Sequence, residues 1–262
     1  MPDLRMGNLD LHYDDRGAGA PLVLLHGLGS SAADWDLQVP AFAARYRLLL
    51  VDLRGHGRSP AGPALSTVEQ MAEDVAALLA RLGLPPAHVV GLSLGGCAAL
   101  ALAARHPQRV RSLVLVNTFA RLRAGGAQGA ARLARRAWLF CTAPMPAVAA
   151  YVAAGLFPEP EHAALRAEAV ARLARNDKRP YLAAMLAVVR FDARRALASI
   201  RCPTLVMAGD RDTTVPRAAA QALRQGIAGA RFAPIANSGH ATPYDQPEVF
   251  NRVVLEFLES VS

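Results

Sequence analysis

The stretch Val89-Val90-Gly91-Leu92-Ser93-Leu94-Gly95-Gly96 decides how the rest of this chain can fold. An apolar, β-branched run stops at a serine that has one glycine two positions before it and another two positions after it. The alanine- and leucine-rich residues 97–105 follow at once and are typical of a helix. The pattern predicts a buried strand that turns sharply into a helix, with Ser93 strained at the turn. Such a turn presents a hydroxyl at a helix N-terminus, where backbone N–H groups stabilise negative charge.

The chain on both sides of this turn alternates between apolar strands and amphipathic helices. Apolar runs predict further strands at residues 22–25, 48–51, 113–116, 203–208 and 231–235, and helical spacing predicts helices near 68–82, 216–225 and 247–259. Strands that are apolar on both faces indicate a sheet covered by helices on both sides. An alternating segment, residues 4–15, predicts an additional β-hairpin around Gly7-Asn8. We therefore predict an α/β protein with a mostly parallel central sheet flanked by helices.

Residues 119–195 interrupt this alternation. They show no strand pattern, only helical segments rich in Ala, Leu and Arg that are punctuated by Gly and Pro. We predict an α/β core formed by residues 1–118 and 196–262, with residues 119–195 inserted as a helical cap. The apolar side chains of this cap are predicted to contact an acyl or alcohol group, and the candidate substrate-binding residues are Trp138, Phe140 and Met145. The alternative interpretation is that they form the core of the cap itself.

Composition excludes several classes of function. The formal net charge of +8 is concentrated between residues 120 and 200, which hold thirteen basic and five acidic residues. We interpret this excess as a solvated face that can also steer anionic substrates, and predict no nucleic-acid partner. Three scattered cysteines predict neither a disulfide framework nor a zinc site. Since no apolar run is long enough to span a membrane and no signal pattern begins the chain, we expect a cytoplasmic protein without metal or cofactor.

A serine hydroxyl attacks a carbonyl only when a base takes its proton. His240 lies between the last predicted strand and the closing helix, in a loop at the carboxyl edge of the sheet. His26 and His56 occupy loops at the same edge but precede the serine turn in the chain. A histidine base needs a carboxylate that holds its tautomer. Asp210 and Asp212 both follow the next-to-last strand, and the spacing alone leaves the choice between them open.

Five motifs in chain order resemble those of the α/β-hydrolase fold family over essentially the whole length of the chain. They are His26-Gly27 (the oxyanion loop), Asp52-Leu53-Arg54-Gly55-His56-Gly57-Arg58-Ser59, the nucleophile elbow from Gly91 to Gly95, the acid loop Gly209-Asp210-Arg211-Asp212-Thr213-Thr214-Val215-Pro216, and Ser238-Gly239-His240. In this family the acid lies three residues past the glycine of its loop, so the resemblance implies Asp212. It also implies an oxyanion hole made by the backbone N–H groups of Leu28 and Leu94.

Within the family, the Gly-Leu-Ser-Leu-Gly-Gly elbow and the N-terminal half are similar to the carboxylesterase, 3-oxoadipate enol-lactonase and non-haem haloperoxidase branch. These enzymes share a triad, so the motifs do not separate them. The resemblance implies a metal-free serine hydrolase that cleaves small to medium carboxylic esters and lactones, with Ser93 as nucleophile, His240 as base and Asp212 as its orienting acid. One alternative is an enol-lactonase, whose substrate carries a carboxylate. Another is a non-hydrolytic ligand receptor or scaffold on the same fold.

Four other residues near the predicted site are interpreted as structural. His26 and His56 are expected to pack or hydrogen-bond within their loops. Cys97, one helical turn after the serine, is expected to be a small packing residue. Asn117 follows the strand at 113–116, where some members of the family keep their acid, and a neutral amide cannot replace a carboxylate.

Overall fold

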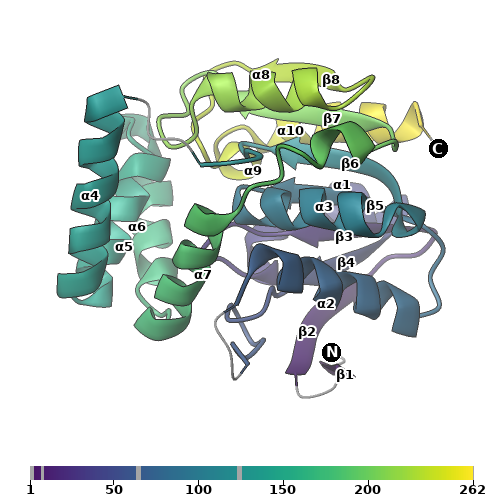
Figure 1. The fold of residues 1–262 in the computed structure, drawn as a ribbon, viewed down its shortest axis with the longest axis horizontal. Helices are drawn as coiled ribbons and strands as arrows, with labels where there is room; N and C mark the ends of the chain where they lie inside the picture. Colours follow the sequence, from purple (N-terminus) through teal and green to yellow (C-terminus); the bar gives the residue numbers. More distant parts are fainter. Residues whose placement is uncertain (1–2, 7–8, 63–65, 123–125, 262) are drawn as a thin grey trace.

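The computed structural model describes residues 3–6, 9–62, 66–122 and 126–261. They form an 8-stranded sheet with the strand order β1-β2-β4-β3-β5-β6-β7-β8 (Figure 1). The strands are β1 (Asp3–Met6), β2 (Leu9–Arg16), β3 (Ala20–Leu25), β4 (Tyr46–Val51), β5 (Ala87–Leu92), β6 (Val110–Val116), β7 (Thr204–Gly209) and β8 (Arg231–Ile235). Strands β3 to β8 pair in parallel, whereas β1 and β2 form the predicted antiparallel hairpin. The predicted α/β class is confirmed; residues 7 and 8 of the hairpin turn lie outside the described residues.

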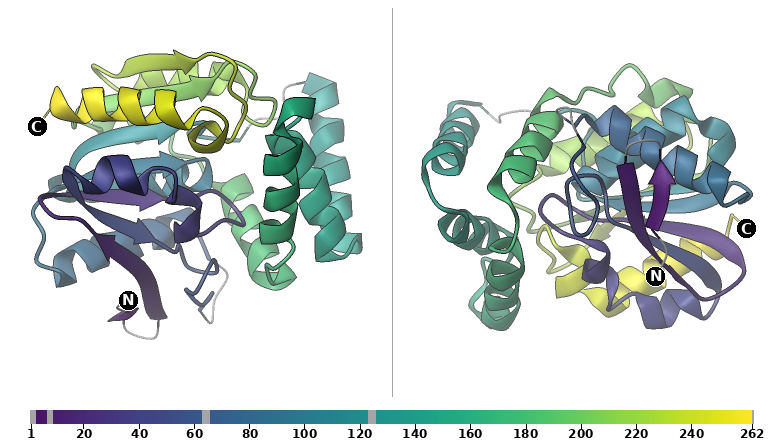
Figure 2. Two further views of the ribbon diagram at one scale, coloured as in Figure 1. Left: turned by 180° about the vertical axis from the view of Figure 1, so that it is seen from behind. Right: turned by 90° about the horizontal axis from the view of Figure 1, so that it is seen from below.

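Helices cover both faces of the sheet (Figures 1 and 2). One face carries α2 (Val68–Arg81), α3 (Leu94–Arg105) and α8 (Arg217–Gly226), and the other carries α1 (Val39–Ala43) and α10 (Pro247–Glu259). Successive strand residues enter opposite layers: Val89 and Leu113 belong to the first apolar cluster, Val90 and Val114 to the second. This two-sided burial is the reason that the strand sequences are apolar at every position.

Helix α2 begins with a capping box at Thr67. The Thr67 hydroxyl oxygen accepts from the Gln70 N–H at 3.1 Å, and the Gln70 side-chain oxygen accepts from the Thr67 N–H at 3.0 Å. The same helix anchors the loop after β4, because Arg54 binds Asp74 through two hydrogen bonds of 2.6 Å. That loop borders the carboxyl edge of the sheet, so α2 helps to hold this edge in place.

The order of the central strands creates a switch point at the carboxyl edge. From β3 the chain moves outward to β4 and then returns across β3 to β5. The connection after β3 therefore leads to α1 on one face of the sheet, and the connection after β5 leads to α3 on the opposite face. Loops that diverge in this way leave a crevice between two strand ends, which is where ligands bind in open α/β sheets.

Residues 119–195 leave and rejoin the sheet at a common point. Ala193 N–H donates to the Ala120 carbonyl at 2.8 Å, and Arg121 forms an isolated bridge with Asp192. Between these ends lie α4 (Gly126–Thr142), α5 (Met145–Leu156), α6 (Ala163–Leu173) and α7 (Lys178–Arg190). Figures 1 and 2 show α4, α5 and α6 side by side, with α7 between them and the core. No helix in the described ranges is both long enough and apolar enough to cross a bilayer.

Two of the three candidate substrate-binding residues lie in the interior of the 119–195 segment. Phe140 and Met145 are buried in an apolar cluster that the 119–195 helices build for themselves, and the Phe140 ring meets Tyr181 edge-on with 5.5 Å between centroids. Helices that stand beside the sheet need a core of their own, so these side chains face one another. Their burial favours the alternative interpretation, in which Phe140 and Met145 form the core of the segment. Trp138 is 66% exposed, and a substrate-binding role for it stays a prediction.

Candidate active site

Ser93 lies at the turn between β5 and α3 in a conformation that few non-glycine residues adopt. Its φ is 53° and its ψ is −111°. The two flanking glycines make this turn possible. A Cβ on Gly91 would overlap the Gly95 carbonyl, and a Cβ on Gly95 would overlap the backbone carbonyls at the end of β3. The hydroxyl of Ser93 makes no capping hydrogen bond to α3, which is the usual role of a serine at this position.

The backbone around Ser93 is held from two sides. Its N–H donates to the Val116 carbonyl at 3.0 Å, and its carbonyl accepts from the Thr118 hydroxyl at 2.7 Å. Cys97 lies one turn further along α3, fully buried and 3.5 Å from the Thr118 hydroxyl. Burial raises the pKa of the Cys97 thiol to about 12, so the thiol stays protonated. Cys97 packs behind the serine and offers no competing nucleophile.

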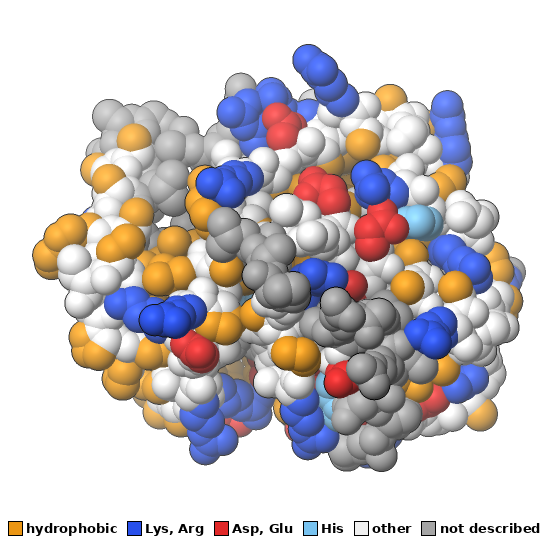
Figure 3. Space-filling view, turned by 60° about the horizontal axis from the view of Figure 1, so that its bottom comes forward, with side chains coloured by type: hydrophobic (Ala, Val, Ile, Leu, Met, Phe, Trp, Pro, Cys, Tyr) orange, Lys and Arg blue, Asp and Glu red, His pale blue; other side chains and the backbone are white. Residues whose placement is uncertain are grey.

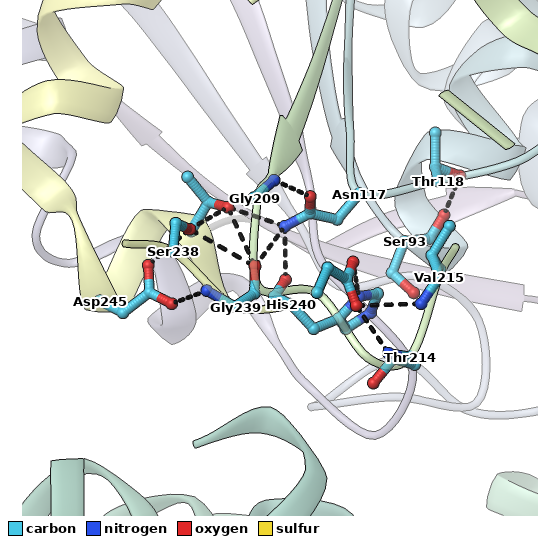
Figure 4. A network of polar contacts seen from close by, with 12 residues as sticks. Ser93, Asn117, Thr118, Gly209, Thr214, Val215, Ser238, Gly239, His240 and Asp245 are labelled. Atoms are coloured by element: carbon cyan, nitrogen blue, oxygen red, sulfur yellow. Dashed lines mark hydrogen bonds and ion pairs between the residues drawn. The ribbon is translucent and has the colours of Figure 1, made fainter. Parts of the chain in front are cut away.

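The imidazole of His240 is hydrogen-bonded to Asp212. The distance between His240 Nδ1 and Asp212 Oδ2 is 2.8 Å, and the two side chains are 7% and 3% exposed. A carboxylate next to Nδ1 keeps the ring proton on that nitrogen and leaves Nε2 as the proton acceptor. In Figure 4 the Ser93 side chain points toward the His240 ring.

The turn after β7 also fixes the second oxygen of Asp212. Asp212 Oδ1 accepts from the backbone N–H groups of Thr214 and Val215 at 2.7 and 2.9 Å. Both carboxylate oxygens are therefore engaged, one by the backbone and one by the imidazole. Asp210 is exposed, and among the described residues its carboxylate accepts one hydrogen bond, from the Ser238 N–H at 3.3 Å. The aspartate in contact with His240 is thus the one that the resemblance implied.

Asn117 connects the ends of three segments beneath His240. Its side-chain nitrogen donates to the carbonyls of Gly239 and His240 at 3.2 and 2.8 Å and to the Thr242 hydroxyl at 2.7 Å. Its side-chain oxygen accepts from the Gly209 N–H at 2.9 Å. These contacts join the end of β6 to the acid loop and to the histidine loop (Figure 4). The prediction identified the amide as neutral but missed its role as the tie between both loops.

A half-buried carboxylate, that of Asp245, holds the other side of the histidine loop. Asp245 accepts from the Gly239 N–H at 2.6 Å and from the Ser238 hydroxyl at 2.8 Å (Figure 4). Burial raises the pKa of Asp245, and these two hydrogen bonds oppose that rise. The spacing of Asp245 from His240 in the sequence carried no signal of this contact.

The loop after β3 borders Ser93. A Cβ on Gly27 would lie 3.8 Å from the Ser93 Cβ, so the Gly27–Leu28 backbone runs close to the serine side chain. In the described part of the chain, neither the Leu28 N–H nor the Leu94 N–H donates a hydrogen bond to another group. Two such N–H groups next to a serine side chain are donors of the kind that can stabilise an oxyanion.

His26 is hydrogen-bonded at both ring nitrogens. Nδ1 donates to the Gly27 carbonyl at 2.8 Å, and Nε2 accepts from the Leu53 N–H at 3.0 Å. Burial lowers the pKa of His26, which keeps the ring neutral. The His56 ring lies 5.1 Å from the His26 ring between centroids, and burial is the main cause that lowers the pKa of His56 to about 3. His26 therefore joins the loop after β3 to the loop after β4, and both rings have the packing and hydrogen-bonding roles expected from the sequence.

The comparisons with known proteins point to one fold family. A family model described as the alpha/beta hydrolase fold matches residues 20–247. The chain is 36% identical to a protein of Azorhizobium caulinodans that is named as a carbamate hydrolase, RutD, over 98% of both chains. It is 33% identical to a pimeloyl-[acyl-carrier protein] methyl ester esterase of Aeromonas hydrophila, over 92% of this chain and 96% of that one. Among solved structures, it resembles an enol-lactonase from Burkholderia xenovorans with a TM-score of 0.90 and 30% identity, over 98% of this chain and 100% of the other.

Proposed function

The chain belongs to the α/β-hydrolase fold family, and from that premise we propose that it is a serine hydrolase that cleaves carboxylic esters through an acyl-enzyme. The substrates in this proposal are small to medium acyl esters, with lactones included. Ser93 is the nucleophile, His240 the base, and Asp212 the group that orients the base. The backbone N–H groups of Leu28 and Leu94 form the oxyanion hole.

Each role follows from chemistry that the geometry allows. The Ser93 oxygen adds to the ester carbonyl while its proton moves to His240 Nε2. The carbonyl oxygen becomes an oxyanion, which the two N–H groups stabilise. Collapse of this intermediate expels the alcohol, which takes the proton from His240, and the acyl group stays on Ser93. Water then attacks the acyl-enzyme with the same base and the same donors, and the acid product leaves.

One observation carries the proposal: the buried 2.8 Å contact between His240 and Asp212 lies at the sheet edge where Ser93 occupies a strained turn. Strained backbone at non-glycine residues clusters at active sites. The test is hydrolysis of p-nitrophenyl butyrate by the wild type and by Ser93→Ala. We expect turnover by the wild type, and loss of at least about 10³-fold in kcat for the variant. Wild-type turnover by Ser93→Ala would refute the assignment.

We further propose that residues 119–195 cover this site as a cap. The segment begins two residues after Asn117, and its helices α6 and α7 reach the loop after β3 through Leu173, Asn176 and Tyr181. It also carries Arg172, which donates to Asp34 at 2.8 Å and to the Tyr244 hydroxyl at 2.6 Å. These contacts support a segment that closes over the strand ends and limits the size of the substrate.

Lactone and carbamate hydrolysis are the second candidates, each favoured by one comparison. The enol-lactonase structure supports cyclic esters, and the named carbamate hydrolase supports substrates whose carbonyl bears nitrogen. Nitrogen donation makes a carbamoyl-enzyme slow to hydrolyse, so p-nitrophenyl N-methylcarbamate separates the cases. An esterase would release about one equivalent of p-nitrophenol and stop, whereas a carbamate hydrolase would turn over. Faster hydrolysis of lactones than of p-nitrophenyl butyrate would instead support a lactonase.

The partner in this proposal is a small molecule. On the face drawn in Figure 3, Lys and Arg side chains are spread among Asp and Glu side chains and do not form one continuous stripe. A nucleic-acid backbone needs such a stripe. In the alternative function, a non-hydrolytic ligand receptor or scaffold, the protein would have the same fold but would not cleave esters. Covalent labelling of the wild type by a fluorophosphonate, with no labelling of Ser93→Ala, would exclude it.

A further inference from the structure

The junction between α6 and α7 rests directly on the loop after β3. The side-chain nitrogen of Asn176 donates to the Gly29 carbonyl at 2.8 Å, and it also donates to the Leu173 carbonyl at 3.0 Å, at the end of α6. One amide therefore ends a helix of the 119–195 segment and holds the backbone of a loop that lies 147 positions earlier in the chain.

Packing leaves this loop little freedom at the point of contact. Gly29 has a φ of +76°, and a Cβ built on it would lie 2.8 Å from Leu173 Cδ2 and 2.6 Å from Tyr181 Cε2. Leu173 and Tyr181 are 5% and 2% exposed. Leu28 packs against both the main core cluster and the cluster of the 119–195 helices. The loop is thus clamped between the core and the 119–195 segment.

A chain of hydrogen bonds runs from Asn176 to the Leu28 N–H. The Gly29 carbonyl and the Ser30 N–H belong to one peptide unit, and Ser30 N–H donates to the Gly27 carbonyl at 3.2 Å. The Gly27 carbonyl and the Leu28 N–H belong to the next unit in this chain of bonds. Since no described peptide bond is cis, the carbonyl and the N–H of each unit point in opposite directions. A donor that holds Gly29 O therefore fixes the direction in which the Leu28 N–H points.

We propose that Asn176 is a positioning residue for the oxyanion hole. This inference rests on the proposed function, because it assigns Leu28 N–H to the oxyanion. Asn176 acts through the Gly29–Ser30 and Gly27–Leu28 peptides and touches no substrate atom. Hydrogen bonds in series also polarise one another, so the same contact makes the Leu28 N–H a stronger donor. The 119–195 segment therefore contributes to catalysis through the loop that it clamps, and not only by covering the site.

The experiment compares Asn176→Ala and Asn176→Asp with the wild type on p-nitrophenyl butyrate. Both acylation and deacylation pass through an oxyanion, so kcat reports the hole whichever step is slow. His26 still holds the Gly27 carbonyl at 2.8 Å, so the donor is misdirected rather than lost. We expect kcat to fall about tenfold in Asn176→Ala, less than the 10²–10³-fold that removal of a donor causes. Asn176→Asp keeps the shape but sets an oxygen against Gly29 O, and its kcat should fall further.

A trifluoromethyl ketone gives a readout that a structural role would not change. Ser93 Oγ adds to its carbonyl, the serine proton moves to His240, and the product is a tetrahedral oxyanion held by the hole. Its inhibition constant should rise by the same factor by which kcat falls, while KM stays within about twofold. The pH profile of kcat/KM should not move, because the contact between Asp212 and His240 is untouched.

Asp177→Ala is the matched control. Asp177 adjoins Asn176 and caps α7 by accepting from the Arg179 N–H at 3.0 Å, without touching Gly29. Its loss should lower the melting temperature and leave kcat within about twofold. Unchanged kcat in both Asn176 variants would overturn the proposal, and so would a fall that Asp177→Ala shares. A wild type that neither hydrolyses p-nitrophenyl butyrate nor reacts with a fluorophosphonate would refute the proposed function itself. Failure of the proposed function is therefore distinguishable from failure of the role proposed for Asn176.

Discussion

Asp212→Asn should convert His240 into the wrong tautomer. Oδ1 of Asp212 accepts two backbone N–H groups, at 2.7 and 2.9 Å, so an amide at this position must keep its oxygen there. Reversing the amide would set its NH2 group against both donors and leave them unpaired, at a cost of about 2–5 kcal/mol. The NH2 group therefore faces His240 Nδ1 and donates to it. The ring proton then has to sit on Nε2, which can no longer accept the proton of Ser93.

The expected loss follows from this tautomer. An amide in place of the carboxylate of a serine triad lowers kcat by about 10⁴-fold, and we expect a loss of about 10³–10⁴-fold here. At 1.36 kcal/mol for each factor of ten, this is about 4–5.5 kcal/mol of transition-state stabilisation. The assay is the initial rate of p-nitrophenyl butyrate hydrolysis at pH 7 to 8. Circular dichroism and the melting temperature should stay near those of the wild type, because the backbone contacts of the residue remain.

Asp210→Asn is the control in the same loop. Asp210 is exposed and accepts one long hydrogen bond of 3.3 Å, so its amide should retain kcat within about threefold. If the Asp212→Asn enzyme keeps more than about a tenth of wild-type kcat, the amide does not force the His240 proton onto Nε2 and the reasoning is refuted. Equal losses in both variants would show that the loop, and not the carboxylate at 212, determines the rate.

Three further predictions test the framework around the site. Gly95→Ala should unfold the elbow, because its Cβ would overlap the Leu25 and His26 carbonyls; we expect a loss of at least about 3 kcal/mol in urea unfolding, and a native melting curve would contradict this. Asn117→Asp replaces the NH2 group that serves three acceptors with an oxygen, and should lower both stability, by about 3 kcal/mol, and kcat; unchanged values would contradict the tie between the loops. Because burial lowers the pKa of His56 to about 3, the unfolded chain binds a proton that the fold does not, so the free energy of unfolding should decrease as pH falls from about 6.5 toward 3. His56→Gln should flatten this decrease in urea unfolding at graded pH, and a parallel pH dependence of the two proteins would refute it.

Local signals in the sequence were sufficient for the sheet and for the elbow. The glycines around Ser93 are required by contacts within a few residues and with the adjacent strand, so their spacing alone identifies the turn. The capping box is equally local, because both of its hydrogen bonds join residues that are three positions apart. Elements defined by their own periodicity were therefore predicted within a few residues.

Contacts between distant loops could not be predicted in this way. Asn117 reaches Gly209 and Thr242 across 92 and 125 positions, and no local pattern encodes such distances. Spacing did not separate Asp210 from Asp212, because the difference lies in which carboxylate the turn directs inward. The helical pattern of residues 119–195 did not separate a Phe140 side chain that contacts a substrate from one that packs within the segment. Periodicity specifies a face, whereas packing specifies its partner.

The unequal burial of the cysteines has a practical consequence. Cys97 is fully buried behind the serine, whereas Cys141 is exposed at the end of α4, and burial raises the pKa of Cys202. A maleimide dye or a nitroxide would therefore react first at Cys141 in the native chain, with no engineered attachment site. Its signal would report any change in the surroundings of α4 during turnover, while the chemistry at the sheet edge proceeds unlabelled.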